Sequence, residues 1–80
     1  MNTNYRLIDI VSLIEKTCNT KAELDNKFKL EYLIPNASED KLKELGFEYI
    51  EKSSYDVCPI YRFNNIVAHF DQNLLHVYEF

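Results

Sequence analysis

The sequence predicts one α+β domain, in which two or three N-terminal helices pack on a C-terminal antiparallel sheet of three to four strands. Apolar residues recur at helical spacing over residues 7–18, whereas residues 47–80 hold eight of the eleven aromatic residues. Aromatic and β-branched side chains suit a half-buried pleated surface, which indicates strands. Within this stretch the dipeptide Asn64-Asn65 separates two alternating segments, as in a tight hairpin. A chain of 80 residues is expected to form a single domain, residues 1–80.

A first helix is expected over about residues 4–17. Asn4 is a suitable N-cap, because its side chain can accept a hydrogen bond from a free backbone N–H. An apolar stripe at helical spacing is widened by flanking residues; together these are Leu7, Ile8, Ile10, Val11, Leu13, Ile14 and Cys18. So wide an apolar arc indicates burial on more than one side. The helix should therefore lie on the sheet, and in the alternative it also forms a homodimer interface.

The next segment admits two interpretations. Thr20 and Glu23 match the capping-box pattern, which favours a second helix over about residues 20–33. Leu24, Phe28 and Tyr32 also have helical spacing, but residues 28, 30, 32 and 34 alternate as apolar positions, which is typical of a strand. We predict the helix and keep a strand over residues 27–34 as the alternative.

A short helix over about residues 38–45 has complete start and stop signals. Ser38 is a good N-cap, and the acidic Glu39 and Asp40 complement the helix dipole in the first turn. Leu42 should face inward. Gly46 can then adopt the left-handed conformation that ends many helices.

Strands are expected at about residues 47–52, 56–63, 66–71 and 75–80. Proline has no N–H to donate to a ladder, so the strand that contains Pro59 should lie at an edge or carry a bulge there. If Asn64-Asn65 is the hairpin loop, one apolar face follows from the register: Phe63 faces Ile66, Tyr61 faces Ala68, and Pro59 faces Phe70.

The last hairpin has two possible registers. A loop of two or four residues pairs Phe70 with Leu75 and places His69 opposite His76. A loop of three or five residues would instead turn His76 and Tyr78 toward the core. The even loop is favoured because it buries Leu75 and Val77. It leaves an amphipathic outer face, a common feature of partner sites, made of Arg62, His69, Asp71, Leu74, His76, Tyr78 and Phe80.

The charge distribution argues against direct binding to nucleic acid. The net charge is −4, and residues 47–80 contain only Lys52 and Arg62 as basic groups. Affinity for nucleic acid depends on Lys and Arg neutralising phosphates. A winged-helix DNA binder would need residues 38–46 as its recognition helix, and that segment has more acids than lysines.

No membrane or export signal is expected. No apolar run approaches the roughly 20 residues that span a bilayer. The first residues lack the basic start and cleavage site of a signal peptide. We therefore expect a cytoplasmic protein.

Catalytic and metal sites are not predicted. His69 and His76 could bind a metal, but the other candidate ligands, Asp71 and Cys58, have no diagnostic spacing. Cys58 with His69 and Asp71 contains the residue types of a nucleophilic site, yet Cys58 precedes Pro59 in a strand without a turn that could form an oxyanion hole. We expect no enzyme activity and no cofactor, and we expect Cys18 and Cys58 to be reduced thiols.

The C-terminal half carries a resemblance. LKELGFEYIEKSSY followed by YRFNNIVAHFDQNLLHVYEF resembles, in style, short proteins of phages and mobile elements from low-GC bacteria. Residues with AT-rich codons (Phe, Tyr, Met, Ile, Asn, Lys) number 34, against 8 for Gly, Ala, Arg and Pro. The resemblance implies a small host-directed or defence-directed accessory protein, of which anti-CRISPR proteins are one kind. Many such proteins are acidic and occupy a target's binding surface. It assigns no functional residue, because no site motif is present to match.

The expected function is therefore that of a non-enzymatic protein-binding inhibitor, acting in the cytoplasm of a bacterial host. Its acidic, aromatic sheet would meet a basic surface of a protein partner. The predicted partner-binding residues are Glu48, Glu51, Tyr55, Asp56, Arg62, His69, Asp71, His76, Tyr78 and Glu79. The first alternative is a homodimeric structural or regulatory module without catalytic activity. The second alternative is a small histidine-dependent metal protein or enzyme.

Overall fold

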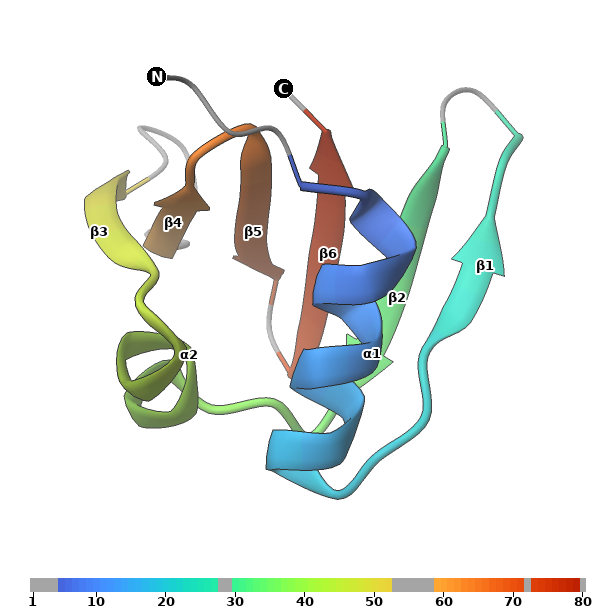
Figure 1. Cartoon of the computed structure of the whole chain (residues 1–80), viewed down its shortest axis with the longest axis horizontal. Helices are drawn as coiled ribbons and strands as arrows, with labels where there is room; N and C mark the ends of the chain where they lie inside the picture. Colours follow the sequence, from blue (N-terminus) through green and yellow to red (C-terminus); the bar gives the residue numbers. More distant parts are fainter. Residues whose placement is uncertain (1–4, 28–29, 53–58, 72, 80) are drawn as a thin grey trace.

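The computed structural model describes residues 5–27, 30–52, 59–71 and 73–79. These residues form a sheet and the helices that pack on one of its faces. The elements follow one another as α1 (Leu7–Cys18), β1 (Glu23–Asp25), β2 (Glu31–Pro35), α2 (Glu39–Leu45), β3 (Glu48–Lys52), β4 (Pro59–Phe63), β5 (Ile66–Asp71) and β6 (Leu74–Glu79) (Figure 1). All pairings are antiparallel, in the order β1-β2-β6-β5-β4-β3. The α+β class is confirmed, but the sheet of the described residues has six strands and not three to four.

The predicted helix over residues 20–33 is wrong, because this segment forms β1 and β2. Tyr32 pairs with Val77 and Ile34 with Leu75, so β2 extends the apolar face of the sheet beyond β6. Pairing with β6 outweighs the local helix signal, since it buries Ile34 completely. The expected capping box is replaced by another contact, in which the Ala22 N–H donates to Glu15 Oε2 at 2.7 Å.

Helix α1 begins three residues later than predicted. Its N-cap is Arg6, which makes no side-chain cap, and the predicted cap Asn4 lies outside the described residues. The chain before the helix is held by the side-chain amide of Asn65. The Tyr5 N–H donates to Asn65 Oδ1, and Asn65 Nδ2 donates to the Tyr5 carbonyl, both at 2.9 Å. This pair ties the start of α1 to the β4–β5 turn.

The predicted helix over residues 38–45 is confirmed as α2. Ser38 Oγ accepts a hydrogen bond from the Lys41 N–H at 3.3 Å, as expected of an N-cap. Gly46 ends the helix in the left-handed region with φ 105°. Leu42 of α2 is fully buried, so it faces inward as expected.

Both predicted hairpin registers are confirmed. Phe63 pairs with Ile66 across the Asn64-Asn65 turn, where Asn64 has a φ of 53°. In the last hairpin Phe70 pairs with Leu75 and His69 with His76, as the even loop requires. The expectation of an edge position for Pro59 is wrong, because β4 lies between β3 and β5. The alternative expectation was a bulge at Pro59. A register shift does occur in the pairing of β4 with β3, but it lies on β3, between Tyr49 and Glu51.

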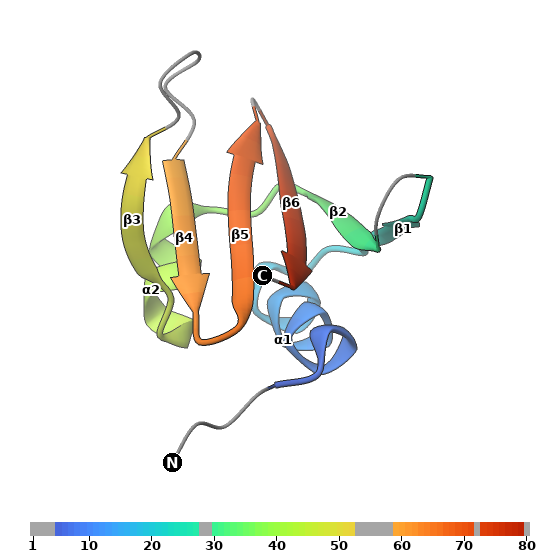
Figure 2. The ribbon, with the colours of Figure 1, turned by 90° about the horizontal axis from the view of Figure 1, so that it is seen from above.

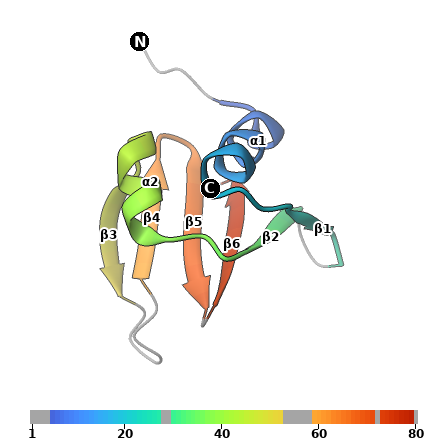
Figure 3. The same cartoon turned by 90° about the horizontal axis from the view of Figure 1, so that it is seen from below.

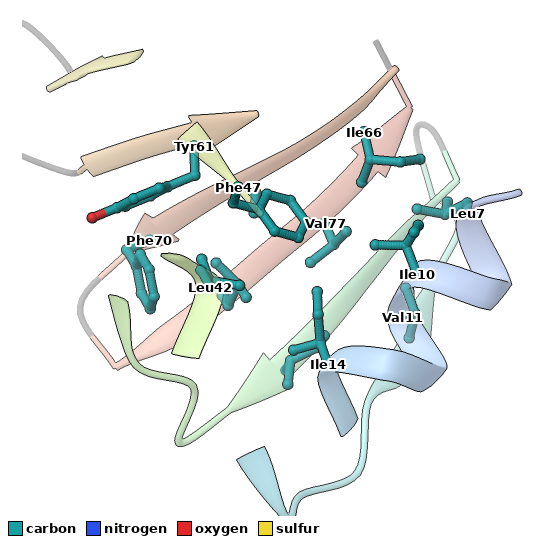
Figure 4. Close-up of a cluster of buried hydrophobic side chains, with 13 residues drawn as sticks. Leu7, Ile10, Val11, Ile14, Leu42, Phe47, Tyr61, Ile66, Phe70 and Val77 are labelled. Carbon is teal, nitrogen blue, oxygen red and sulfur yellow. The ribbon is translucent and has the colours of Figure 1, made fainter. Parts of the chain in front are cut away.

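One apolar core lies between the sheet and the two helices. Leu7, Ile10, Val11 and Ile14 of α1 and Leu42 of α2 meet buried side chains from β2, β4, β5 and β6 (Figure 4). Figure 3 shows α2 in front of β3 and β4 on this side of the sheet. All buried residues in the described part of the chain are apolar or, in one case, tyrosine. Within that part, neither helix is long and apolar enough to cross a membrane.

Tyr61 is the polar member of this core. Its ring is 1% exposed, and its hydroxyl donates to the Glu39 carboxylate at the start of α2. Burial raises the pKa of Tyr61 well above its ordinary value, and the contact with Glu39 raises it further. The hydrogen bond therefore joins the middle of the sheet to the first turn of α2.

We predict that stability falls at alkaline pH because of Tyr61. Above about pH 10 a tyrosine ionises in the unfolded chain, whereas the raised pKa keeps Tyr61 protonated in the folded chain. The unfolded state then binds fewer protons, so the free energy of unfolding decreases by about 1.4 kcal/mol per pH unit for this group. Urea unfolding between pH 9 and 11.5 should show a shallower decline for Tyr61→Phe than for the wild type. Equal slopes would contradict the buried phenol.

Candidate functional site

The face of the sheet opposite the helices is the candidate site, and we call it the outer face. In Figure 2 the strands β3 and β4 lie in front of α2, so this side of the sheet is turned toward the viewer. The cross-strand register arranges its side chains in rows. One complete row contains Glu48, Arg62, Val67, Tyr78, Glu31 and Asp25.

A second row runs parallel to the first. It contains Ile60, His69, His76, Leu33 and Glu23. A shorter third row contains Asp71, Leu74 and Pro35. The two helices, which pack on the other face, contribute nothing to these rows in the described part of the chain.

The outer face is strongly acidic. Its side chains in the described part of the chain include one arginine and five carboxylates, which are Glu23, Asp25, Glu31, Glu48 and Asp71. Most of the carboxylates lie toward the borders, on β1, β2 and β3. The centre, on β5 and β6, is apolar, aromatic and imidazole-bearing. This is the arrangement of many protein interfaces, with an apolar centre and a polar rim.

His69 and His76 lie side by side in the centre, with ring centroids 5.8 Å apart. His76 Nδ1 lies 3.4 Å from Glu31 Oε1, and its Nε2 lies 3.9 Å from Asp71 Oδ2. The His76 ring therefore lies between the carboxylates of Glu31 and Asp71. His69 Nε2 is buried and has no hydrogen-bond partner among the described residues.

The same described residues contain no group of three or more metal-ligating side chains that could hold an ion. The sequence alone does not predict a metal site made of His69, His76, Asp71 and Cys58. Cys58 lies outside the described residues, so the structure does not test this set of ligands. Cys18 is half-buried and has a free thiol.

Tyr78 stands beside Glu31 in the first row. Burial raises the pKa of this phenol above its ordinary value, and the neighbouring Glu31 carboxylate raises it further. A half-buried tyrosine of this kind offers a partner both an apolar ring and a hydrogen-bonding tip.

The structure brings together six of the predicted partner-binding residues on the outer face: Glu48, Arg62, His69, Asp71, His76 and Tyr78. Glu79 is not among them, because it pairs with the buried Ile66 and so belongs to the opposite face. The backbone of Glu51 pairs with Ile60. Tyr55 and Asp56 lie outside the described residues.

The helical interpretation of residues 20–33 does not predict the acids on β1 and β2 as part of the site. It places Glu23, Asp25 and Glu31 in a helix, and a helix there would not bring them beside the histidines of the sheet. The alternation of Leu30, Tyr32 and Ile34 was the signal that could have found them, because it places Glu31 on the face opposite the core.

A hollow of about 270 Å³ lies at the end of the outer face. Its lining residues are Gly46, Glu48, Ile50, Arg62, Phe63 and Asn64. The Arg62 Nε–H donates to the Asn64 carbonyl at 2.8 Å beside it. In the described part of the chain its lining includes no histidine, cysteine or serine.

Helix α1 bears on the homodimer alternative. Ile8 and Leu13 are 42% and 43% exposed. Five residues of an α-helix correspond to a rotation of about 140° between them, so they flank the buried stripe on its two sides. They do not form one continuous apolar patch on α1.

No family model matches this chain, and no curated protein or solved structure was found to be similar to it.

Proposed function

We propose that this protein is a non-enzymatic binding protein whose outer face occupies a basic surface of another protein. The observation that carries the proposal is the composition of that face. Five carboxylates and one arginine surround an apolar and aromatic centre that neither helix covers in the described part of the chain. We further propose that it acts as a phage or mobile-element inhibitor of the anti-CRISPR kind.

Charge and packing have separate roles in this proposal. Complementary charge across an interface accelerates encounter and selects against wrong partners. Aromatic and apolar residues at the centre of an interface supply most of the binding free energy. The carboxylates on the borders would therefore set the association rate, and the residues around Tyr78 would set the lifetime of the complex.

The inhibitor proposal is supported by the small size, the acidity and the C-terminal resemblance described above. A surface that evolved to bind nucleic acid is rich in Lys and Arg. Such a surface is a suitable target for the outer face.

Charge reversal on the outer face is expected to abolish capture of a basic partner. We predict that wild-type protein, used as bait in a lysate of a low-GC bacterium, retains a basic nuclease or nucleic-acid-binding protein identified by mass. A Glu48→Lys/Asp71→Lys variant should lose it. For the purified pair, the association rate at low salt should fall by about tenfold or more, because rim charges act mainly on this rate.

The matched control is Glu44→Lys/Glu79→Lys. It changes the net charge by the same amount at exposed positions that lie away from the outer face. This control should retain the partner. Retention of nothing by the wild type at low and moderate salt, or equal loss with both variants, would contradict the proposal.

A further inference from the structure

We infer that the element bound by the outer face is an amphipathic α-helix with basic residues on both sides of its apolar stripe. This inference rests on the proposed function and makes it specific. It follows from the way in which apolar and acidic side chains are divided across the six strands.

The centre of the outer face forms an apolar strip along β5 and β6. Val67 and Tyr78 are paired in one row, and His69 and His76 in the next. Ile60 and Leu33 continue the second row on either side, and Leu74 closes the strip at one end. Apart from the buried Val67, these side chains are half-buried and remain accessible to a partner.

Carboxylates border this strip on both sides. Glu31, Asp25 and Glu23 lie on β2 and β1, whereas on the other side Glu48 of β3 lies beyond Arg62 of β4, with which it pairs. Asp71, with its side chain 50% exposed, lies at the end of the strip. A partner that fits would therefore present apolar groups along a line and cations on both sides of it, and on the β3 side a cation must reach Glu48 beyond Arg62.

The dimensions match a helix. Strands are about 4.8 Å apart, so β3 and β1 each lie about 12 Å from the midline between β5 and β6. An α-helix has a radius of about 5–6 Å with its side chains. Lysine and arginine side chains extend beyond this radius and can bury their stems while the charged ends reach the carboxylates.

The strip is also long enough. The five residues from Val67 to Asp71, paired with those from Leu74 to Tyr78, span about 16 Å, which equals the length of about 11 helical residues. An extended peptide fits less well. Its side chains alternate between two faces, so half of its cations would point away from the outer face.

The test uses three synthetic peptides of about 18 residues. The first has leucines at i, i+3, i+4 and i+7 with lysines on both sides of this stripe. The second has the same composition in an order without helical periodicity, and in the third glutamates replace the lysines. Fluorescence anisotropy should show that the first binds the wild-type chain at least about tenfold more tightly than the other two. Its titration should shift the NMR signals of the rings of His69, His76 and Tyr78.

Substitutions in the strip should weaken the binding of the first peptide only. Leu33→Asn/Leu74→Asn should weaken its binding by about tenfold, as expected for the centre of an interface. The control Leu13→Asn changes an exposed leucine on α1 and should leave the affinity within about twofold. Circular dichroism of both variants verifies that they fold, and the NMR shifts in the wild type test the site independently.

Each negative outcome has a distinct meaning. Equal affinity for the two lysine peptides would overturn the helix inference and leave the proposed function intact. Shifts confined to α1 or α2 would also overturn it. Binding of neither lysine peptide would count against both the inference and the proposed function.

Discussion

Replacing Ile34 with alanine is expected to lower the free energy of unfolding by about 3 kcal/mol. Ile34 is completely buried and pairs with Leu75 in the interior of the sheet. Truncation of a fully buried isoleucine removes apolar contacts and leaves a cavity, with losses of about 2–5 kcal/mol. An 80-residue domain is expected to have a total stability near the lower end of the usual range, about 5 kcal/mol. The variant should therefore be close to unfolded in mild urea.

The matched control is Leu33→Ala, one residue earlier. Leu33 lies half-buried on the outer face opposite His76, so its truncation should cost less than about 1.5 kcal/mol. Urea unfolding measured by circular dichroism compares the two. The difference between neighbours is the signature of a strand with one buried face. Equal losses would contradict the assignment of Glu31–Pro35 as β2.

Replacing Gly46 with alanine is expected to cost about 2 kcal/mol. Gly46 has a φ of 105°, a conformation that side-chain-bearing residues rarely adopt. A Cβ atom added there would also lie 3.0 Å from Cε2 of Phe63. That ring contacts Tyr5 and Phe47, with centroid distances of 5.0 and 5.4 Å, so it cannot move away without disturbing its neighbours.

A double-mutant cycle separates the two causes. In a Phe63→Leu background the loss caused by Gly46→Ala should be smaller by about 0.5–1 kcal/mol, because the crowding is relieved and the backbone strain remains. Thermal or urea unfolding of the four proteins gives the value. A Gly46→Ala variant as stable as the wild type would show that the helix end does not have the described conformation.

The parts of the fold with local signals were predictable. Ser38 and Gly46 lie at the two ends of α2, and both act through neighbouring backbone groups. The turn at Asn64 and the alternation around it were sufficient for the β4–β5 register, since hairpin partners are close in sequence.

The strand β2 had a local signal, the alternation that supports the alternative strand over residues 27–34, but β1 and the long-range pairing of β2 had none. The residues of β2 find their partners in β6, about forty positions later in the chain. Local patterns around Thr20 and Glu23 favoured a helix, and nothing near them in the sequence indicates that β6 offers an open edge. A non-local pairing therefore decided the structure of this segment.

In the candidate site, too, the parts that depend on local signals were predictable and the parts that depend on long-range pairing were not. Its centre, with His69, His76 and Tyr78, was expected from the register of a single hairpin, and the structure has that register. Its acidic border on β1 and β2 depends on the long-range pairing and was missed. Glu79 was grouped with the site by charge alone, yet strand alternation places it on the other face.

The most direct test of the binding face is a footprint of the retained basic partner on this chain. Hydroxyl-radical labelling with mass detection measures the accessibility of individual side chains, with and without the partner. The proposed binding mode predicts protection of His69, Leu74, His76 and Tyr78, with the reactivity of Ile8 and Leu13 on α1 unchanged. Protection of α1 with no change at the four outer-face residues would contradict it.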